Sequence, residues 1–482
     1  MMTKGRLSLK TKLEILSKQD LQRVHHASLE ILQSTGVIFH HEEALRILKS
    51  KGARVEGFTA YLPGGMVEKA LEHTPSTYVH LARNPAHSVT VGEGFLVHPN
   101  IGPVFVQDLD RGRRRGTLQD FENFQKLAQA SDVVHLAGAT PVAPDDVPAS
   151  ERALYMVYAS IRHSDKPVVG SCTTATKAKQ TLELVEMAMG GSGKLDQDHL
   201  IGVSINPMSP LAFGREILET MMAYAARNQP VFVLPCILAG ATGPITPYGM
   251  VLQQNSEFLA GLTLLQCIRE GSPVVYAPAS TAAWMRTGGY VTGPPEAFLI
   301  NTANLQLALD LYKLPTRIMH GMTDSKEVDC QAGYETMQNM LMGMLSGGHI
   351  LEECLGVLDS IMTTSYEKWI IDEELLSRVM RICRGIDTSE EALSLSVIQE
   401  IGPGGNYLMH DQTLAHMREV WEPTVSVWKS YSEWQDNGAK DALHRANELW
   451  KSILDDAPET LIDPALDKDL LAYVKQAADT PV

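Results

Sequence analysis

The repeated order of a short apolar run followed by a helical segment constrains the fold of this chain more than any other feature. Seven such runs are VVHLAG, PVVGS, LIGVSI, PVFVLP, PVVYA, TRIMH and HILEE, and each precedes a stretch of helical pattern. An eighth unit starts with PVFVQD at 103–108 and continues into a helix that Thr117 would cap through Asp120. Eight strand–helix alternations predict an α/β fold, a (β/α)8 TIM barrel, with strands buried on both faces.

The alternative is an open doubly wound sheet, which usually carries a glycine-rich phosphate-binding turn after an early strand. The motif Gly-x-Gly-x-x-Gly is absent from the sequence, which favours the barrel. Helical spacing from Ser17 to about Leu71, then short β-branched runs up to Val106, predict an N-terminal helical and β-hairpin extension. We therefore expect the extension at 1–100, the catalytic barrel at 101–370 and a C-terminal helical extension at 371–482, which wraps the barrel or makes a subunit contact.

Composition and charge narrow the class of protein. Lys and Arg number 41 against 57 Asp and Glu, a formal net charge of -16, which disfavours a nucleic-acid binder. The N-terminus lacks the apolar core of a secretory signal, and no apolar run approaches about 18 residues, so we expect a cytoplasmic protein with no membrane contact. The six cysteines are scattered without a Cys-x-x-Cys pair, which predicts neither a disulfide framework nor a structural zinc site.

In a barrel the active site lies at the carboxyl ends of the strands, so the residues after each run are the candidates for chemistry. Those residues are Gln107, Asp108, Thr140, Ser171, Cys172, Asn206, Cys236, Tyr276, His320, Glu352 and Glu353. Strand interiors and loops add Phe105, Phe213, Tyr248, Trp284, Arg286, Arg317, Asp324, Tyr334 and His349. The local signatures of zinc peptidases, serine hydrolases and P-loop enzymes are absent.

Histidines and cysteines leave two alternatives open. His98, His135, His320 and His349 would form a metal site if they converged, but hydrogen-bonded core histidines give the same pattern. Cys172 and Cys236 are either reactive thiolates or small buried apolar residues. We expect no bound metal, and the residues alone do not name a reaction.

Five stretches carry a resemblance to a known family. They are GPVFVQDLDRGRRRGTLQDF (102–121), AGATGPITPYGMVLQQNSEFLAGL (239–262), GSPVVYAPASTAAWMRTGG (271–289), HGMTDSKEVDCQAGYET (320–336) and GPGGNYLMHDQTLAHMREVWEP (402–423). They resemble the trimethylamine methyltransferase family, (β/α)8 barrels that pass a methyl group from a methylamine to the cobalt of a separate corrinoid protein. The founding members contain pyrrolysine, whereas this sequence has only standard residues. The resemblance therefore implies a quaternary amine as methyl donor, with glycine betaine first and proline betaine, carnitine or butyrobetaine as alternatives.

The resemblance also implies roles for particular residues. A quaternary ammonium group favours an aromatic cage, for which Phe105, Phe213, Tyr276 and Trp284 are the candidates, each of which could equally be ordinary packing. Arg317 and His349 are the candidates for the substrate carboxylate. Asp324 and Gln331 would orient the substrate or face the corrin, although Asp324 would alternatively cap a helix beginning near Lys326. A barrel that binds a betaine or a corrinoid protein without turnover remains a third possibility.

The cofactor is expected on a partner. Corrinoid carriers display Asp-x-His-x-x-Gly, and this sequence has no such spacing, so we expect no permanently bound cofactor. A cob(I)alamin-type corrinoid would arrive on its cognate protein and dock over the barrel mouth, at a rim that includes Met208, Leu211 and Met322. The resemblance further implies a homo-oligomer.

Overall fold

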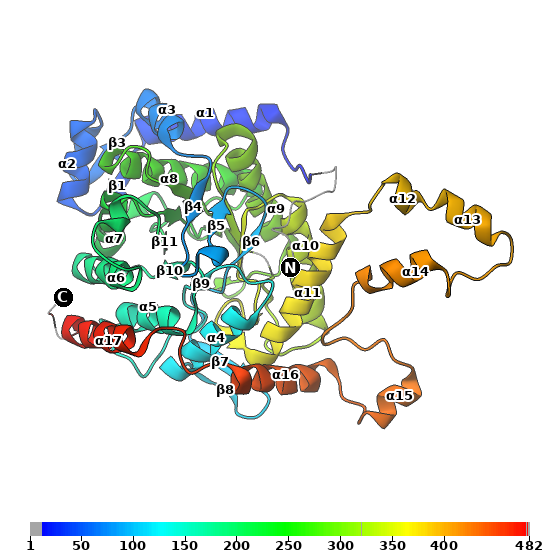
Figure 1. Ribbon diagram of the computed structural model, residues 1–482. Helices are drawn as coiled ribbons and strands as arrows, with labels where there is room; N and C mark the ends of the chain where they lie inside the picture. The colour runs from blue at the N-terminus through cyan, green and yellow to red at the C-terminus, as the bar shows by residue number, and fades with distance from the viewer. Residues whose placement is uncertain (1–11, 320, 479, 481–482) are drawn as a thin grey trace.

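The chain has an α/β fold in which eight parallel strands in the middle of the molecule are each followed by a helix (Figure 1). The computed structural model describes residues 12–319, 321–478 and 480. The eight strands are β6 (Leu96–Val97), β9 (Ala137–Gly138), β10 (Val168–Gly170), β11 (Ile201–Ile205), β13 (Val231–Val233), β15 (Val274–Tyr276), β18 (Arg317–Met319) and β19 (Ile350–Glu352). The helices that follow them are α4 (Leu118–Ala130), α5 (Arg152–His163), α6 (Ala175–Ala188), α7 (Arg215–Ala226), α8 (Pro247–Ile268), α9 (Pro295–Gln306), α10 (Cys330–Leu345) and α11 (Tyr366–Arg384).

The pairings run in cyclic order through these strands. One parallel sheet has the order β15-β13-β11-β10-β9 and a second has the order β18-β19-β6. A parallel bridge between Tyr276 and Thr316 connects β15 to β18. At the other junction, the carbonyl oxygen of Val97 accepts hydrogen bonds from the backbone N–H groups of His135 and Leu136, and Ile101 bridges Thr140.

The prediction that PVFVQD supplies the first of these strands is wrong. That segment is β7 (Phe105–Asp108), which pairs antiparallel with β8 (Gly112–Arg115) and parallel with β21 (Thr363–Ser365). Because β8 carries consecutive exposed or half-buried arginines, this hairpin does not fit a sheet buried on both faces. The first strand is instead β6, from a run that we expected in the N-terminal extension. The predicted cap is confirmed, since Thr117 and Asp120 form a capping box at the start of α4.

The N-terminal extension packs on one side of the body (Figure 1). Its helices α1 (Lys18–Ser34), α2 (Glu42–Ser50) and α3 (Gly64–His73) all contact α8. Between them lie β1 (Val37–Phe39), β2 (Arg54–Glu56) and β3 (Thr59–Tyr61), and β1 pairs with β12 (Ala212–Phe213), which follows β11. The strands β4 (Tyr78–His80) and β5 (Val89–Val91) form a separate hairpin.

The C-terminal segment packs around the body, which is one of the two arrangements expected for it, the other being a subunit contact. Helix α16 (Ala442–Asp456) packs against α11 and α4, and α17 (Pro464–Ala478) packs against α5 and α6. Between α11 and α16 the chain projects away from the body through α12 (Glu390–Leu393), α13 (Leu395–Ile401), α14 (Asp411–His416) and α15 (Tyr431–Asp436) (Figure 1). Among the described residues, no helix is long and apolar enough to span a bilayer. All six cysteines are free thiols.

Candidate active site

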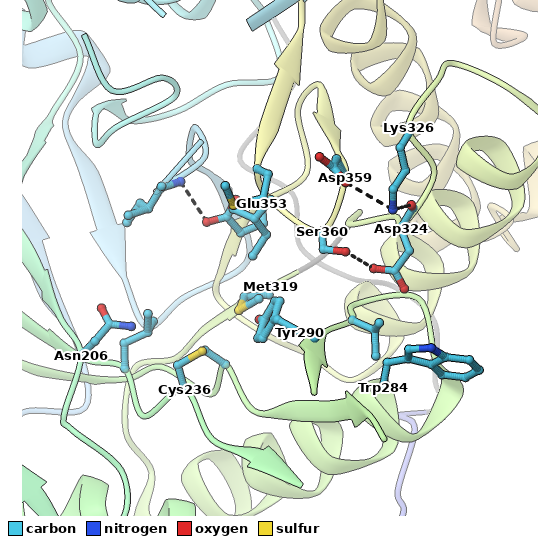
Figure 2. Close-up of a pocket in the computed structure, with 18 of the residues that line it drawn as sticks. Asn206, Cys236, Trp284, Tyr290, Met319, Asp324, Lys326, Glu353, Asp359 and Ser360 are labelled. Atoms are coloured by element: carbon cyan, nitrogen blue, oxygen red, sulfur yellow. Dashed lines mark hydrogen bonds and ion pairs between the residues drawn. The ribbon is translucent and has the colours of Figure 1, made fainter. Parts of the chain in front are cut away.

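A cavity of about 780 Å³ opens at the carboxyl ends of the parallel strands. Its walls contain residues that end or follow these strands, such as Asn206 after β11, Cys236 after β13, Met319 at the end of β18 and Glu353 after β19. Figure 2 shows Tyr290 and Met319 between Asn206 on one side and Trp284 on the other. The lining is mainly apolar with a few charged groups, which is typical of a small-molecule site.

Two hairpins that follow strands of the parallel sheets form the rim. The first consists of β16 (Thr281–Trp284) and β17 (Gly289–Tyr290), with Trp284 opposite Gly289 and Ala283 opposite Tyr290. It brings Trp284, which is 50% exposed, and the half-buried Tyr290 to the same cavity. The second consists of β20 (Val357–Leu358) and β21, and its turn at 359–362 also lines the cavity. Three residues of that turn have positive φ, which marks a constrained backbone beside the site.

A buried charged cluster lies at the base of the cavity. The guanidinium group of Arg317 pairs with Glu352, and its Nη2 atom lies 3.7 Å from Oε1 of Glu353. Nδ1 of His98 bonds Glu352 from the other side, and burial lowers the pKa of His98 to about 3, so a neutral ring donates that hydrogen bond. Each of these four side chains is at most 2% exposed. Such a cluster requires nearly complete pairing, because an unpaired buried charge is strongly destabilising.

The pairing is nevertheless incomplete on the side of the cavity. Nε and Nη1 of Arg317 and Oε2 of Glu353 have no hydrogen-bond partner among the described residues, whereas the Tyr290 hydroxyl meets the Cys236 thiol. Arg317, Glu353 and Tyr290 all line the cavity. Buried polar groups without partners cost about 1–3 kcal/mol each, so their presence here indicates that a polar ligand completes them.

Glu353 has an unusual conformation and an unusual pKa. Its φ of 56° is in the left-handed region, and the backbone N–H of Ile101 donates to its Oε1 at 2.9 Å. Burial raises the pKa of Glu353 to about 7, although the charge of Arg317 and the hydrogen bond from Ile101 act in the opposite direction. Near neutral pH this side chain therefore exists in both protonation states, and it can donate or accept a hydrogen bond.

Asp324 joins two loops of the rim. Its Oδ1 accepts from the Ser360 hydroxyl (Figure 2). The same oxygen accepts from the backbone N–H and hydroxyl of Thr292, and its Oδ2 accepts from the N–H of Gly293. Both carboxylate oxygens are therefore occupied by protein donors. The expectation that Asp324 caps a helix near Lys326 is wrong, because α10 begins at Cys330 and Asp329 caps it.

Of the residues to which the resemblance gives a role, Trp284, Arg317 and Asp324 line this cavity, as do the strand-end candidates Asn206, Cys236 and Glu353. The other aromatic residues expected in the cage do not. The ring of Phe105 is covered by Arg113, whose guanidinium carbon lies 3.6 Å from the ring centroid. Phe213 is fully buried and stacks on Phe39, where the extension meets the body. Tyr276 is fully buried and its hydroxyl donates to Oδ1 of Asn304 at 2.9 Å, in the helical layer. These positions argue against an ammonium cage built from the three.

His349 and Gln331 also lie outside the cavity lining. His349 precedes β19, so it is at the amino ends of the strands, where its Nδ1 accepts from the N–H of Thr316. Burial lowers the pKa of His349 to about 4, so it carries no positive charge for a carboxylate. Gln331 donates to Glu335, whose other oxygen accepts from Thr323 and from the N–H of Asp324. Gln331 thus acts on the rim only through Glu335.

The residues that sequence reasoning left without a role are Tyr290 and Glu353. Glu353 was among the candidates that follow a strand, but its role depends on the position of the Arg317 guanidinium group beside it, which the sequence does not show. Tyr290 does not directly follow one of the eight parallel strands, and the β16–β17 hairpin brings it to the cavity.

Of the histidines considered as metal ligands, the three that the structure describes do not converge. His98 follows β6, whereas His135 and His349 precede their strands at the opposite end, and His320 lies outside the described residues. In the described part of the chain, no three His, Cys, Asp or Glu side chains are grouped closely enough to hold a metal ion.

Comparisons with known proteins agree on one family. The family model described as trimethylamine methyltransferase matches residues 5–480. The glycine betaine methyltransferase of Desulfitobacterium hafniense is 36% identical over 470 residues, 96% of this chain and 97% of that protein. Two further relatives are each 30% identical: trimethylamine methyltransferase MttB of Desulfitobacterium hafniense, over 92% of this chain and 90% of that protein, and proline betaine:corrinoid methyltransferase of Eubacterium limosum, over 84% and 85%.

A solved structure supports the fold. Monomethylamine methyltransferase of Methanosarcina barkeri superposes with a TM-score of 0.52 at 11% identity, over 94% of this chain and 90% of that chain. The chain thus combines the fold of a methylamine methyltransferase with a family match over nearly its whole length. It is a methyltransferase and belongs to the trimethylamine methyltransferase family.

Proposed function

We propose that this methyltransferase takes a methyl group from glycine betaine and passes it to the cobalt(I) of a corrinoid carried by a partner protein. The observation that carries the proposal is the cavity at the carboxyl ends of the strands, where aromatic side chains face a buried guanidinium group with unpaired donors. Glycine betaine has the matching chemistry, because it joins a trimethylammonium group to a carboxylate. The 36% identity to a glycine betaine methyltransferase supports the same substrate.

Each end of the substrate has a partner in this arrangement. Nε and Nη1 of Arg317 donate to the substrate carboxylate, and protonated Glu353 donates a further hydrogen bond. Trp284 and Tyr290 attract the trimethylammonium group through their ring faces, at about 0.5–2 kcal/mol each. Trp284 lies in the rim towards the solvent, whereas Arg317 is buried at the base of the cavity. The ammonium group of the substrate therefore lies at the mouth and its carboxylate at the base.

The chemistry of a quaternary amine requires no acid from the protein. The electron pair of cobalt(I) attacks one N-methyl carbon, a Co–C bond forms and the C–N bond breaks. Nitrogen keeps the electron pair of the broken bond, which gives neutral dimethylglycine nitrogen and methylcobalt(III). The protein excludes water and orients one methyl group outward. Because the positive charge of the ammonium nitrogen is lost during the reaction, weak aromatic contacts hold the cation without over-stabilising the ground state.

The cyclic pairing of the eight parallel strands supports a closed (β/α)8 barrel, which we propose as the scaffold. A corrinoid protein then docks over the open mouth. Of the expected rim residues, Met208 is 52% exposed, whereas Met322 is buried and is not available to a partner. We propose that no corrinoid stays bound to this chain between turnovers. We also place the reaction in the cytoplasm, which agrees with six free cysteines.

The size of the cavity favours larger betaines as a second candidate class. A volume of about 780 Å³ is within the range of sites for drug-sized ligands, and proline betaine or carnitine would keep the same charged ends. A few pocket side chains then decide between them.

The test is anaerobic demethylation by the purified chain with free cob(I)alamin. We expect loss of cobalt(I) absorbance and formation of dimethylglycine with glycine betaine, and no reaction with trimethylamine. Proline betaine and carnitine are run in parallel, and a higher kcat/KM for either would assign the larger substrate. Binding of betaines without demethylation, also with the native corrinoid carrier present, would refute the enzymatic proposal.

A further inference from the structure

The carboxylate of Asp324 joins two parts of the rim that are distant in the sequence. Oδ1 accepts from the backbone N–H of Thr292 at 2.8 Å, and Oδ2 accepts from the N–H of Gly293 at 2.9 Å, just after β17. Oδ1 also accepts from the hydroxyl of Ser360, in the turn between β20 and β21 (Figure 2). Asp324 itself lies in the loop between β18 and α10. One side chain thus connects the end of the first hairpin to the turn of the second.

The turn of the second hairpin is also held by other contacts. The backbone N–H of Ser360 donates to the carbonyl oxygen of Thr323 at 3.1 Å, next to Asp324. This loop is in turn fixed to α10, because Oε2 of Glu335 accepts from the Thr323 hydroxyl and from the N–H of Asp324. The turn can therefore keep its place without the Asp324 carboxylate, and the loop provides a fixed support for the first hairpin.

The strand β17 depends more strongly on this support. In the sheet with the order β14-β16-β17, where β14 is Leu238–Ala239, β17 is an edge strand that pairs with β16. Just after β17, the carbonyl oxygen of Val291 accepts from the Thr281 hydroxyl, and the next two residues bond Asp324. A two-residue edge strand has few hydrogen bonds to its neighbour. The contacts at its end therefore decide where Tyr290 lies.

The segment after β17 also packs closely on α10. A Cβ atom at Gly293 would lie 2.7 Å from the carboxylate of Glu335, closer than Cβ atoms approach their neighbours in proteins. Glu335 is not free to move away, because it holds the Thr323 hydroxyl and the N–H of Asp324. The segment is thus seated tightly between two acidic side chains that are themselves anchored.

The position of β17 matters for the cavity because this strand carries Tyr290. Tyr290 lines the cavity, and its hydroxyl meets the thiol of Cys236, which follows β13. Both side chains are half-buried. A displacement of β17 would therefore remove an aromatic ring from the cavity and uncover the Cys236 thiol.

We propose that Asp324 is a positioning residue, which holds β17 so that the ring of Tyr290 faces the trimethylammonium group of the substrate. This role rests on the proposed function, because that function supplies the cation. Asp324 acts through the backbone of the hairpin and not on the substrate, since protein donors occupy both of its carboxylate oxygens. The affinity for the cation therefore depends on a residue that does not contact it.

Alkylation of the cysteines by iodoacetamide tests the position of β17 without substrate. In Asp324→Asn an amide nitrogen replaces one acceptor oxygen, so at least one donor of the rim loses its partner. We expect Cys236 to react about 10- to 100-fold faster than in the parent protein, as the loss of hydrogen bonds to a carboxylate predicts. Peptide mass spectrometry resolves the sites of alkylation. The buried Cys354 and Cys383 report unfolding of the body and should react no faster than in the parent protein.

Steady-state kinetics with free cob(I)alamin test the consequence for the substrate. KM for glycine betaine should rise about 2- to 30-fold in Asp324→Asn, which corresponds to one aromatic contact with the cation, and kcat should stay within about twofold. Asp329→Asn is the matched control, because Asp329 is a carboxylate of the same loop that accepts from the Ser325 hydroxyl and from the N–H of Ala332. It should keep the parental KM and the parental alkylation rate of Cys236.

Gly293→Ala is a second variant in case Asp324→Asn does not fold. The added methyl group displaces the same segment from Glu335, so Cys236 should again react faster. The positioning role is wrong if Cys236 keeps its parental rate in both variants, or if the two buried cysteines react as fast as Cys236. Fast alkylation with an unchanged KM would refute the contact between Tyr290 and the cation. A parent protein without demethylation would refute the proposed function, whereas faster alkylation in the variants would still confirm that Asp324 positions β17.

Discussion

The protonation state of Glu353 should control the affinity for a carboxylate substrate. Burial raises the pKa of this side chain to about 7, and it lies 3.7 Å from the guanidinium group that we assign to the substrate carboxylate. Protonated Glu353 donates a hydrogen bond to that carboxylate, whereas the ionised form repels it and competes for Arg317. Affinity should therefore fall as pH rises through about 7.

The size of the effect follows from the pKa. With a pKa of about 7, the protonated fraction falls from about nine-tenths at pH 6 to about one-tenth at pH 8. We expect kcat/KM for glycine betaine to fall about tenfold across this interval, mainly through KM. In Glu353→Gln the amide donates at every pH, so kcat/KM should be constant between pH 6 and pH 8, within about threefold of the parent value at pH 6.

The assay follows cob(I)alamin methylation under anaerobic conditions at several pH values. Methylation of the same cobalamin by methyl iodide controls for the intrinsic pH dependence of the acceptor. Asp359→Asn is the control variant, because Asp359 is a carboxylate of the rim that pairs with Lys326 and Arg113. It should keep the tenfold decline. A kcat/KM that rises with pH in the parent protein would show that ionised Glu353 is the form that favours binding. An unchanged decline in Glu353→Gln would show that this side chain has no part in the pH dependence.

Three further predictions concern the cation, the buried ion pair and the hydrogen bonds that attach residues 424–426 to Glu374 of α11. Trp284→Ala should raise KM about 2- to 30-fold with little change in kcat, because the attraction between the indole ring and the trimethylammonium group is lost. Trp284→Phe should restore most of the affinity. A loss confined to kcat in steady-state kinetics would contradict a binding role. Arg317→Met should lower the free energy of unfolding by about 3–5 kcal/mol in denaturant titrations, because Glu352 keeps a buried charge without its partner. The double variant Arg317→Met with Glu352→Gln should recover part of this lost free energy. Burial acts to raise the pKa of Glu374, but hydrogen bonds from Ser426, Val425 and Arg378 outweigh it and hold the pKa at about 2, below its ordinary 4.5. The contribution of Glu374 to stability is therefore complete above about pH 4.5 and is lost as pH falls towards 2. Glu374→Gln should therefore lower the thermal midpoint at pH 6 and narrow its gap to the parent protein at pH 3; an equal gap at both pH values would refute this assignment.

The order of the elements could be predicted from the sequence because it depends on local patterns. Short apolar runs between helical segments indicate buried parallel strands, and seven of the eight predicted units have their strand where expected. The capping box at Thr117 and Asp120 is equally local, since both residues are within one helical turn.

The first strand was assigned wrongly because two neighbouring apolar segments have similar patterns. Only tertiary pairing shows that β6 lies between β19 and β9, while β7 joins the hairpin with β8. The family resemblance gave the substrate class, but it did not show which side chains face the substrate.

The identity of the site residues was decided by side-chain direction and by loops. Arg317 and Tyr276 both lie on strands of the parallel sheets, yet Arg317 lines the cavity, whereas the Tyr276 hydroxyl donates to Asn304 in the helical layer. Successive residues of a strand point to opposite faces, and a fully apolar run does not reveal which face is the interior. Glu353 reaches the cavity through a left-handed backbone conformation, and Tyr290 reaches it through the β16–β17 hairpin. The sequence by itself thus determined the family, the element order and the local caps, whereas the three-dimensional packing decided which polar groups meet at the site, because their convergence depends on contacts between distant segments.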